Sequence, residues 1–407
     1  MFQVVKLILF SKMKIFEKYL IIYLSPIINH SAKKIDLVVN TAKALSVYCQ
    51  VLYIPINQKP LSLKNCLMPS NMLKILKNIN HIKKSRFIEW QEFCCLPFQR
   101  FKNIKILNKY CHLYLLKKFL LRNKKIIIFS SSPDNKIKNI IRILKPIAVL
   151  ADRFDIWERN EFLETKELFN YYISNSQWIY KGQKAEITNL LSIPEGHVSE
   201  NSIKKLYFAS KNNKLRKTNK KIILLICTVT WRINIKLLIK ITEKFPNYRL
   251  LIIGAYLLNN KFSNDWNDKN KQSIKLWEKL LTKKNCQFIP ITNQDDLAKL
   301  KIKASLGIIP YDTKYDFNKY CHPIKLYHYF AMGIPILSTK IKPILKYKSR
   351  YCHFADNQEI FISKIPKIIS LETTKTEKKD MFDIAIKQTY QQKAATIIKF
   401  IRDKIIL

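Results

Sequence analysis

Short apolar runs alternate with amphipathic stretches along most of this chain. Runs rich in Ile, Leu, Val and Tyr are typical of strands buried on both faces of a parallel sheet, whereas apolar residues that recur every three or four positions are typical of helices packed against one. The alternation therefore predicts an α/β architecture with parallel sheets. In the first half, the predicted strands are Tyr19–Ser25, 51–54, 125–129, 147–150 and 172–174.

The stretch 199–221 is the clearest boundary in the chain. It is rich in Lys, Asn and Ser and contains little that could enter a core, so we predict a linker there. A second alternating series follows it. Two similar α/β halves around a linker place a ligand cleft between them, at the carboxyl ends of the strands. The second-half predictions are the strands 222–227, 249–253, 287–289, Leu306–Ile309 and 335–339, and the helices Ile235–Lys244, 294–301, 324–331 and 382–401.

The segment 323–339 carries the most informative of the chain's five glycines. Average usage would give roughly 28 glycines, so we expect the few that are present to lie mostly where a Cβ does not fit. The segment predicts a short helix, a glycine stop at Gly333 and a buried strand. A helix start that presents Lys325, followed by a tight turn into a strand, is a place to hold a phosphorylated ligand.

The net charge of +44 has two open explanations. Most of the cations are lysines, and the chain is crowded with Ile, Asn, Tyr and Phe, which AT-rich codons favour; drift in an AT-rich genome accounts for this. The alternative is attraction to an anionic membrane face. No basic-aromatic module of a known nucleic-acid binder is visible, so we expect no nucleic-acid partner.

We expect a cytoplasmic protein, with peripheral contact at the inner membrane face left open. No apolar run is long enough to span a membrane, and no cleavage site follows the short runs 4–10 and 19–24. Residues 1–17 form an extension that is either an anchor or upstream of a true start at Met13. The nine cysteines include no Cys-x-x-Cys pair, which favours a reducing compartment.

The segment 323–339 resembles the GT-B glycosyltransferases, and the stretch 148–157 is similar to one in the members that build envelope polysaccharides. Their pattern Pro-x-Lys-Leu-x-Glu-Tyr-x-Ala-x-Gly-x-Pro-Val is matched at all but two of its fixed positions. Three other stretches, 304–310, 251–254 and 193–196, are similar to short sequence motifs of the family. The stretch 148–157 looks like the family's Tyr-Asp-x-x-Asp-Asp-Trp motif. The matching motif residues are Pro323, Lys325, Leu326, Tyr329, Ala331, Gly333 and Pro335.

The resemblance implies two Rossmann-like domains that face each other across a cleft. Residues 18–200 would be the acceptor domain, 201–221 the linker, 222–380 the donor domain and 381–407 a helix that crosses back to the first domain. The implied activity is sugar transfer from a nucleoside-diphosphate sugar to a hydroxyl of a glycan or lipid-linked acceptor. The nucleotide sugar is a co-substrate, and no cofactor or metal is expected; Cys321, His322 and His328 lack metal-site spacing.

The resemblance assigns donor phosphate to Lys325 and to Arg232, whose guanidinium suits bidentate pairing with phosphate. The alternatives without a binding role are that Lys325 faces solvent and that Arg232 forms a structural ion pair with a nearby carboxylate. Ser338 and Thr339, at a strand end, can add hydroxyl or backbone donors, or they are ordinary strand-end polar residues.

His328 is the main departure from the family, which usually has Glu here to accept hydrogen bonds from the donor ribose. A neutral imidazole accepts only one such bond, so His328 is either a ribose contact or a core-facing histidine. Many relatives carry another Glu where this chain has Tyr320. Gly333 would close the donor helix, and the loop at Pro290 and Ile291 would frame the nucleobase.

Asp152 and Asp155 follow a predicted strand and should point into the cleft. If the reaction inverts configuration, an acceptor hydroxyl needs a general base, and either carboxylate can serve or contact the acceptor. The alternative is capping of a turn or helix. His30 is a candidate acceptor contact. Residues 227–231, where many relatives have a glycine-rich phosphate loop, contain no glycine. A catalytically weakened GT-B protein that binds a nucleotide, glycan or partner remains the alternative function, because this loop and the Glu are missing.

Overall fold

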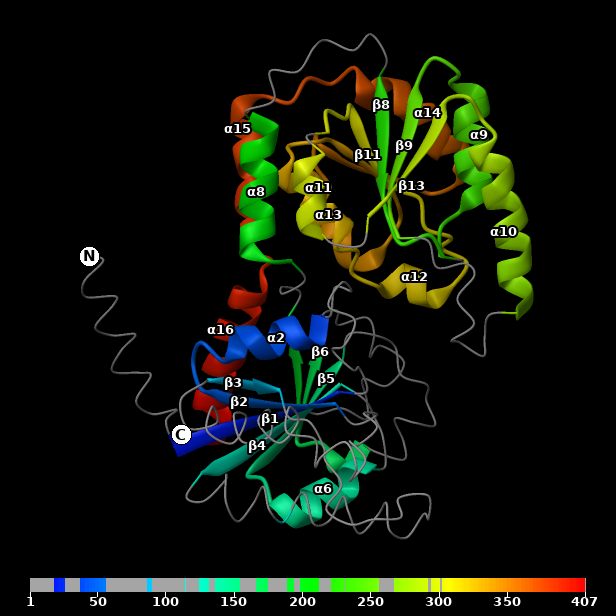
Figure 1. The fold of residues 1–407 in the computed structure, drawn as a ribbon. Coiled ribbons are helices and arrows are strands. Elements are labelled where there is room, and N and C mark those ends of the chain that lie inside the picture. Colours follow the sequence, from blue (N-terminus) through cyan, green and yellow to red (C-terminus); the bar gives the residue numbers. More distant parts are fainter. Residues whose placement is uncertain are drawn as a thin grey trace, which may run out of the picture.

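A computed structural model describes fourteen parts of the chain. Its strands form two parallel sheets, one in each half, and Figure 1 shows them as two lobes. In the part of the chain that is described, no helix is long and apolar enough to cross a membrane. The described residues are 18–25, 37–55, 86–89, 114, 124–131, 136–153, 166–174, 189–193, 198–211, 221–230, 232–255, 267–291, 294–300 and 302–406.

The first sheet has the order β3-β2-β1-β4-β5-β6-β7, and every neighbouring pair is parallel. Side chains alternate between its two faces, so the odd residues of the first strand enter one core and the even residues the other. Both faces are buried, as the unbroken apolar runs predict. Its strands are β1 (Tyr19–Ser25), β2 (Gln50–Pro55), β3 (Phe87–Glu89), β4 (Lys125–Ser130), β5 (Ala148–Arg153), β6 (Tyr171–Ser174) and β7 (Leu190–Ser192).

The second sheet has the order β10-β9-β8-β11-β12-β13, again with parallel pairs throughout. Both sheets thus place their first six strands in the order 3-2-1-4-5-6 of the Rossmann fold, which confirms the predicted pair of Rossmann-like domains. Its strands are β8 (Ile222–Ile226), β9 (Arg249–Gly254), β10 (Cys286–Pro290), β11 (Leu306–Ile309), β12 (Ile336–Thr339) and β13 (Cys352–Ala355).

Helices cover both sheets. The described α-helices of the first half are α2 (Leu37–Leu45) and α6 (Lys136–Leu144), which lie on opposite faces of the first sheet. Short 3-10 turns, η3 (Lys166–Leu168) and η6 (Lys342–Tyr347), and a π-helical turn, η7 (Arg402–Ile406), complete the described elements. The remaining helices are α8 (Glu200–Lys211), α9 (Ile235–Lys244), α10 (Asn267–Leu281), α11 (Gln294–Lys299), α12 (Asp316–Tyr320), α13 (Lys325–Ala331), α14 (Gln358–Ile369), α15 (Lys375–Ile386) and α16 (Tyr390–Ile401).

The helix α16 packs on the first sheet beside α2, although the chain has by then completed the second sheet (Figure 1). Its apolar face, which includes Ala394, Ile397 and Ile401, is fully buried in the core of the first domain. The two chain segments that pass between the lobes pair with each other. Val198 forms a parallel bridge with Thr389, and the Tyr390 N–H donates to the Val198 carbonyl at 3.1 Å.

Two sequence predictions need correction. The predicted linker 201–221 begins inside α8, and Ile203 and Leu206 of that helix are buried in the core of the second domain. The predicted single helix 382–401 is two helices, because Thr389 caps the start of α16 with its side chain on the Gln392 N–H at 3.4 Å. The preceding helix α15 begins earlier than predicted, at a capping box that Thr374 and Glu377 form.

Candidate donor-binding site

Most of the candidate donor residues gather at one edge of the second sheet. All strands of a parallel sheet end at the same edge, so the loops that follow β8 to β12 lie next to one another. Arg232 follows β8, Pro290 ends β10, and Ser338 and Thr339 end β12. In Figure 1 this edge, marked by α12, lies on the side of the second lobe that is turned toward the first.

A buried tyrosine fixes the helix that carries Lys325. The Tyr329 hydroxyl accepts the Ile226 N–H at 2.9 Å, and its hydrogen has the carbonyl oxygens of Leu224 (3.1 Å) and Ile308 (3.0 Å) as acceptors. Its ring lies directly on Gly307, where an added Cβ would come within 2.7 Å of the ring. The glycine therefore lets α13 lie close to the sheet, and the hydrogen bonds of Tyr329 fix the rotation of the helix about its own axis.

Lys325 is held almost out of solvent at the start of α13, with 8% of its surface exposed. Its Nζ lies 4.5 Å from the centroid of the Tyr311 ring, an arrangement in which the ring face attracts the cation. Burial raises the pKa of Cys227, just beyond β8, to about 11, and the charge of Lys325 opposes this shift. No carboxylate among the described residues forms an ion pair with this lysine, so its charge is available to an anionic ligand.

Arg232 is also free of carboxylates within the described ranges, which argues against the alternative of a structural ion pair. Its guanidinium carbon lies 3.8 Å from the centroid of the Phe317 ring. Its backbone is held on both sides: the N–H donates to the Thr230 hydroxyl at 3.4 Å, and the carbonyl accepts the Asp312 N–H at 3.1 Å. The adjacent residue, Ile233, forms an isolated bridge with Tyr311, which links Arg232 to the ring that holds Lys325.

His328 lies one turn after Lys325 and is 3% exposed. In the described part of the chain neither of its ring nitrogens has a hydrogen-bond partner. Burial, assisted by the charge of Lys325, lowers the pKa of His328 to about 4, so the ring is neutral at pH 7. A buried neutral imidazole with both nitrogens unpaired is costly unless a ligand supplies a donor to one nitrogen and an acceptor to the other, as two hydroxyls can.

We expect His328 to make the protein less stable in acid. Because its pKa is below that of an unfolded histidine, the unfolded chain takes up a proton first as the pH falls below about 6.5. The fold should lose about 3 kcal/mol between pH 7 and pH 4 from this residue alone. The measurement is denaturant unfolding across this range for wild type and His328→Asn, since other titrating groups are common to both. Parallel curves for the two proteins would refute this expectation.

The other predicted donor residues on this edge are bonded to the backbone. The Ser338 hydroxyl donates to the Thr339 carbonyl at 2.8 Å, and the Thr339 hydroxyl donates to the Ile309 carbonyl at 3.4 Å. The Ile291 N–H donates to the Gly254 carbonyl at 2.9 Å, whereas Pro290 is exposed. These residues therefore shape the edge, and Pro290 is the most exposed of the four.

Gly333 is at the wrong end of α13 to contact a donor phosphate. Its φ of 65° ends the helix as predicted, but Lys325 lies at the other end, on the opposite edge of the sheet. An added Cβ at Gly333 would come within 2.7 Å of Lys378 on α15, and the Thr373 hydroxyl donates to the Gly333 carbonyl at 3.3 Å. The glycine therefore makes room for α15 and is not a binding residue.

Asp152 is not placed as a catalytic base. It lies at the carboxyl end of β5 with none of its surface exposed, and Lys393 of α16 binds it with Nζ–O distances of 3.0 and 3.3 Å. The Tyr23 hydroxyl donates to the same carboxylate. Burial lowers the pKa of Lys393, and the carboxylate opposes this shift. Asp152 thus joins the first sheet to the helix that returns from the second domain.

Two predicted acceptor-side residues, Asp155 and His30, lie outside the described residues. Tyr320, where relatives carry Glu, ends α12, and its hydroxyl accepts a hydrogen bond from Lys342 at 3.2 Å. Tyr311, Phe317 and Asn318 were not predicted from the sequence. Their only signal is position, because they follow a predicted strand at its carboxyl end, and α12 is too short to show a helical period.

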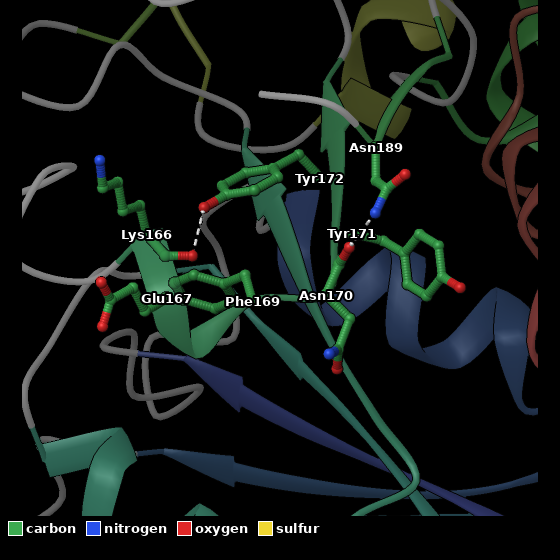
Figure 2. A pocket seen from close by; sticks show the side chains of 7 residues that line it. All are labelled: Lys166, Glu167, Phe169, Asn170, Tyr171, Tyr172 and Asn189. Atoms are coloured by element: carbon green, nitrogen blue, oxygen red, sulfur yellow. Dashed lines mark hydrogen bonds between the residues drawn. The ribbon is translucent and has the colours of Figure 1, made fainter. Parts of the chain in front are cut away.

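A pocket of about 400 Å³ opens in the first domain, at the opposite edge of its sheet (Figure 2). It lies at the amino ends of β6 and β7, between η3 and the residues before these strands. The polar groups that Figure 2 shows are partly bonded within the protein: Asn189 donates to the Asn170 carbonyl at 3.0 Å and Tyr172 to the Lys166 carbonyl at 2.9 Å. This pocket brings together none of the predicted site residues.

Part of the chain matches a known family, and several solved structures share its fold. Residues 208–387 match the family model of glycosyl transferases group 1. Similar solved structures include a glycosyltransferase from Rickettsia africae ESF-5 (13% identity, TM-score 0.61, 95% of this chain and 99% of that one). A second is sucrose-phosphate synthase from Thermosynechococcus elongatus (11% identity, TM-score 0.65, 94% of this chain and 98% of that one). A third is Anabaena HepE in complex with UDP and glucose (11% identity, TM-score 0.59, 93% of this chain and 99% of that one). No curated protein matches the sequence.

The chain therefore has the two-domain GT-B fold, as the sequence predicted. The match to glycosyl transferases group 1 falls on its C-terminal part, which includes Arg232, Lys325 and His328.

Proposed function

We propose that the protein is a glycosyltransferase that uses a nucleoside-diphosphate sugar. The observation that carries the proposal is the pair Arg232 and Lys325 at the carboxyl edge of the second sheet. Both cations are fixed over aromatic rings, and no described carboxylate neutralises either one. A diphosphate is the anion that two such cations suit, and Anabaena HepE, which has a similar fold, is known in complex with UDP-glucose.

In the proposed reaction, an acceptor hydroxyl oxygen forms a bond to the donor's anomeric carbon. The bond from that carbon to the diphosphate oxygen breaks, and its electron pair leaves with the diphosphate. Arg232 and Lys325 stabilise this developing charge, so the proposed reaction requires no metal ion. The transferred group in this proposal is a hexosyl group. His328 would accept a hydrogen bond from one donor hydroxyl at its unprotonated ring nitrogen and donate its N–H to a second oxygen, in place of the carboxylate that relatives use.

For the acceptor side, we propose a glycan or lipid-linked hydroxyl, as in the synthesis of an envelope polysaccharide. Asp155 is the remaining candidate base, since Asp152 is engaged by Lys393. His30 stays a candidate acceptor contact. A cytoplasmic enzyme with peripheral contact to the inner membrane face would meet such an acceptor, and the excess of lysine favours contact with anionic lipid.

A donor screen tests this proposal. We expect slow release of the nucleoside diphosphate from at least one UDP-, GDP- or ADP-sugar without added acceptor, with water taking the acceptor's place. Release should fall at least tenfold in Lys325→Ala, because the leaving group loses a cation. The measurement is nucleoside diphosphate released, quantified by chromatography. Release that is equal in wild type and Lys325→Ala would contradict the proposed site.

A second candidate function follows from His328. A neutral imidazole forms weaker bonds to a donor hydroxyl than a carboxylate does, so the protein is alternatively a weakened GT-B protein that binds a nucleotide or glycan. Binding of a nucleotide without hydrolysis or transfer of any donor would favour this alternative over the enzyme.

A further inference from the structure

The two candidate phosphate-binding cations share an unusual environment. Lys325 and Arg232 form no ion pair with the residues that the structure describes, although Lys325 is more than nine-tenths buried. Burying a charge without a counter-charge is unfavourable. An aromatic face beneath each cation offsets part of this cost, and each ring also restricts where the cation can lie.

Both rings come from the short segment that follows β11. Tyr311 lies beneath Lys325, with 4.5 Å from Nζ to the ring centroid, and Phe317 lies beneath Arg232 at 3.8 Å. The same segment supplies Asn318, which has no exposed surface. The Asn318 Nδ2 donates to the Arg232 carbonyl at 3.2 Å and to the Asp312 carbonyl at 2.9 Å. This one segment therefore contacts both cations: it places a ring against the side chain of Lys325, and a ring and an amide against the side chain and backbone of Arg232.

The segment also pairs the Asp312 carboxylate with a cation other than Arg232. The Asp312 backbone touches Arg232, but the Asp312 carboxylate accepts the Lys314 N–H at 3.2 Å and pairs with the Lys314 ammonium at 3.2 Å. The hydrogen bond to Asp312 and the charge of Asp312 raise the pKa of Lys314, as an ion pair does. Asp312 therefore does not neutralise the charge of Arg232.

We propose that Tyr311, Phe317 and Asn318, here called the aromatic brace, are positioning residues for the donor diphosphate. This inference rests on the proposed function and adds to it the residues that aim the two cations. The brace acts through Lys325 and Arg232 and does not touch the reacting atoms. Because it fixes two cations relative to each other, it selects a diphosphate over a monophosphate that shares the same nucleoside.

The test compares the affinities of UDP and UMP by isothermal titration calorimetry. Removing a ring with Phe317→Leu or Tyr311→Leu should reduce the preference for UDP over UMP by about 3- to 30-fold. The matched controls Phe317→Tyr and Tyr311→Phe keep each ring and should keep the preference within about twofold. Melting temperatures show that each variant is folded. If a leucine variant does not fold, the Asn318→Ala variant is measured in its place. Asn318→Ala removes two hydrogen bonds and keeps both cations and both rings.

Each outcome decides one claim. If Lys325→Ala and Arg232→Ala weaken UDP binding while the leucine variants keep the wild-type preference, the brace is wrong and the donor site stands. If the ring-preserving controls lose the preference as well, the rings are not what matters and the brace is also wrong. If UDP does not bind, GDP with GMP and ADP with AMP take its place. If the wild type binds none of the three diphosphates, the proposed function fails, and the brace falls with it.

Discussion

Lys393→Met is expected to lower the free energy of unfolding of the first domain by about 3–5 kcal/mol. Lys393 and Asp152 are 1% and 0% exposed, and their ion pair joins α16 to β5. Methionine preserves most of the side-chain volume but leaves the Asp152 carboxylate buried with only the Tyr23 hydroxyl as a described partner. Removing one member of a buried pair costs far more than the pair contributes, because the other charge is left unpaired.

Two controls separate this effect from a general sensitivity of α16. Lys399→Met makes the same change at an exposed position of the same helix and should alter stability by less than about 0.5 kcal/mol. The double variant Lys393→Met/Asp152→Asn removes both charges and keeps an acceptor for Tyr23, so it should recover most of the loss. The measurement is denaturant unfolding followed by circular dichroism. Equal unfolding of Lys393→Met and Lys399→Met would show that the ion pair is not structural.

Lys325→Ala/Arg232→Ala is expected to weaken nucleoside-diphosphate binding by about 100- to 10,000-fold. A hydrogen bond to a charged group is worth about 1.5–3 kcal/mol, and both cations would contact the diphosphate. Neither change should unfold the protein, because neither side chain forms an ion pair in the described part of the chain. The measurement is isothermal titration calorimetry with the diphosphate that the wild type binds.

The matched control for this variant is Lys240→Ala/Arg249→Ala. It removes one lysine and one arginine from exposed positions of the same domain, on α9 and at the amino end of β9. The net charge changes by the same amount, so a general loss of attraction for anions would affect both variants equally. A comparable loss of affinity in the control would show that binding depends on the overall charge and not on this edge of the sheet.

The fold could be predicted because its strands are buried on both faces. Such strands appear as apolar runs that need no partner to be recognised, and β1, β11 and α9 have the predicted bounds. Short or polar elements could not be found this way: α8 and α15 carry mixed faces, and α12 has only five residues. The break before α16 depends on the pairing of Thr389 with Val198, which lies far away in the sequence.

The candidate site was predictable as far as its motif extends. The motif indicates Lys325, and the scarcity of arginine draws attention to Arg232. The roles of Gly333 and Asp152 could not be judged from sequence, because they depend on neighbours from α15 and α16. The aromatic brace was missed for the same reason, since its contacts form only when the loops after β8 and β11 meet.

Titration of the wild-type protein with UDP, GDP and ADP tests the central claim most directly. If Arg232 and Lys325 form a donor-diphosphate site, at least one of the three nucleotides should bind with a stoichiometry of about one per chain, and its monophosphate should bind more weakly. Failure of all three to bind to a protein that melts cooperatively would contradict the claim.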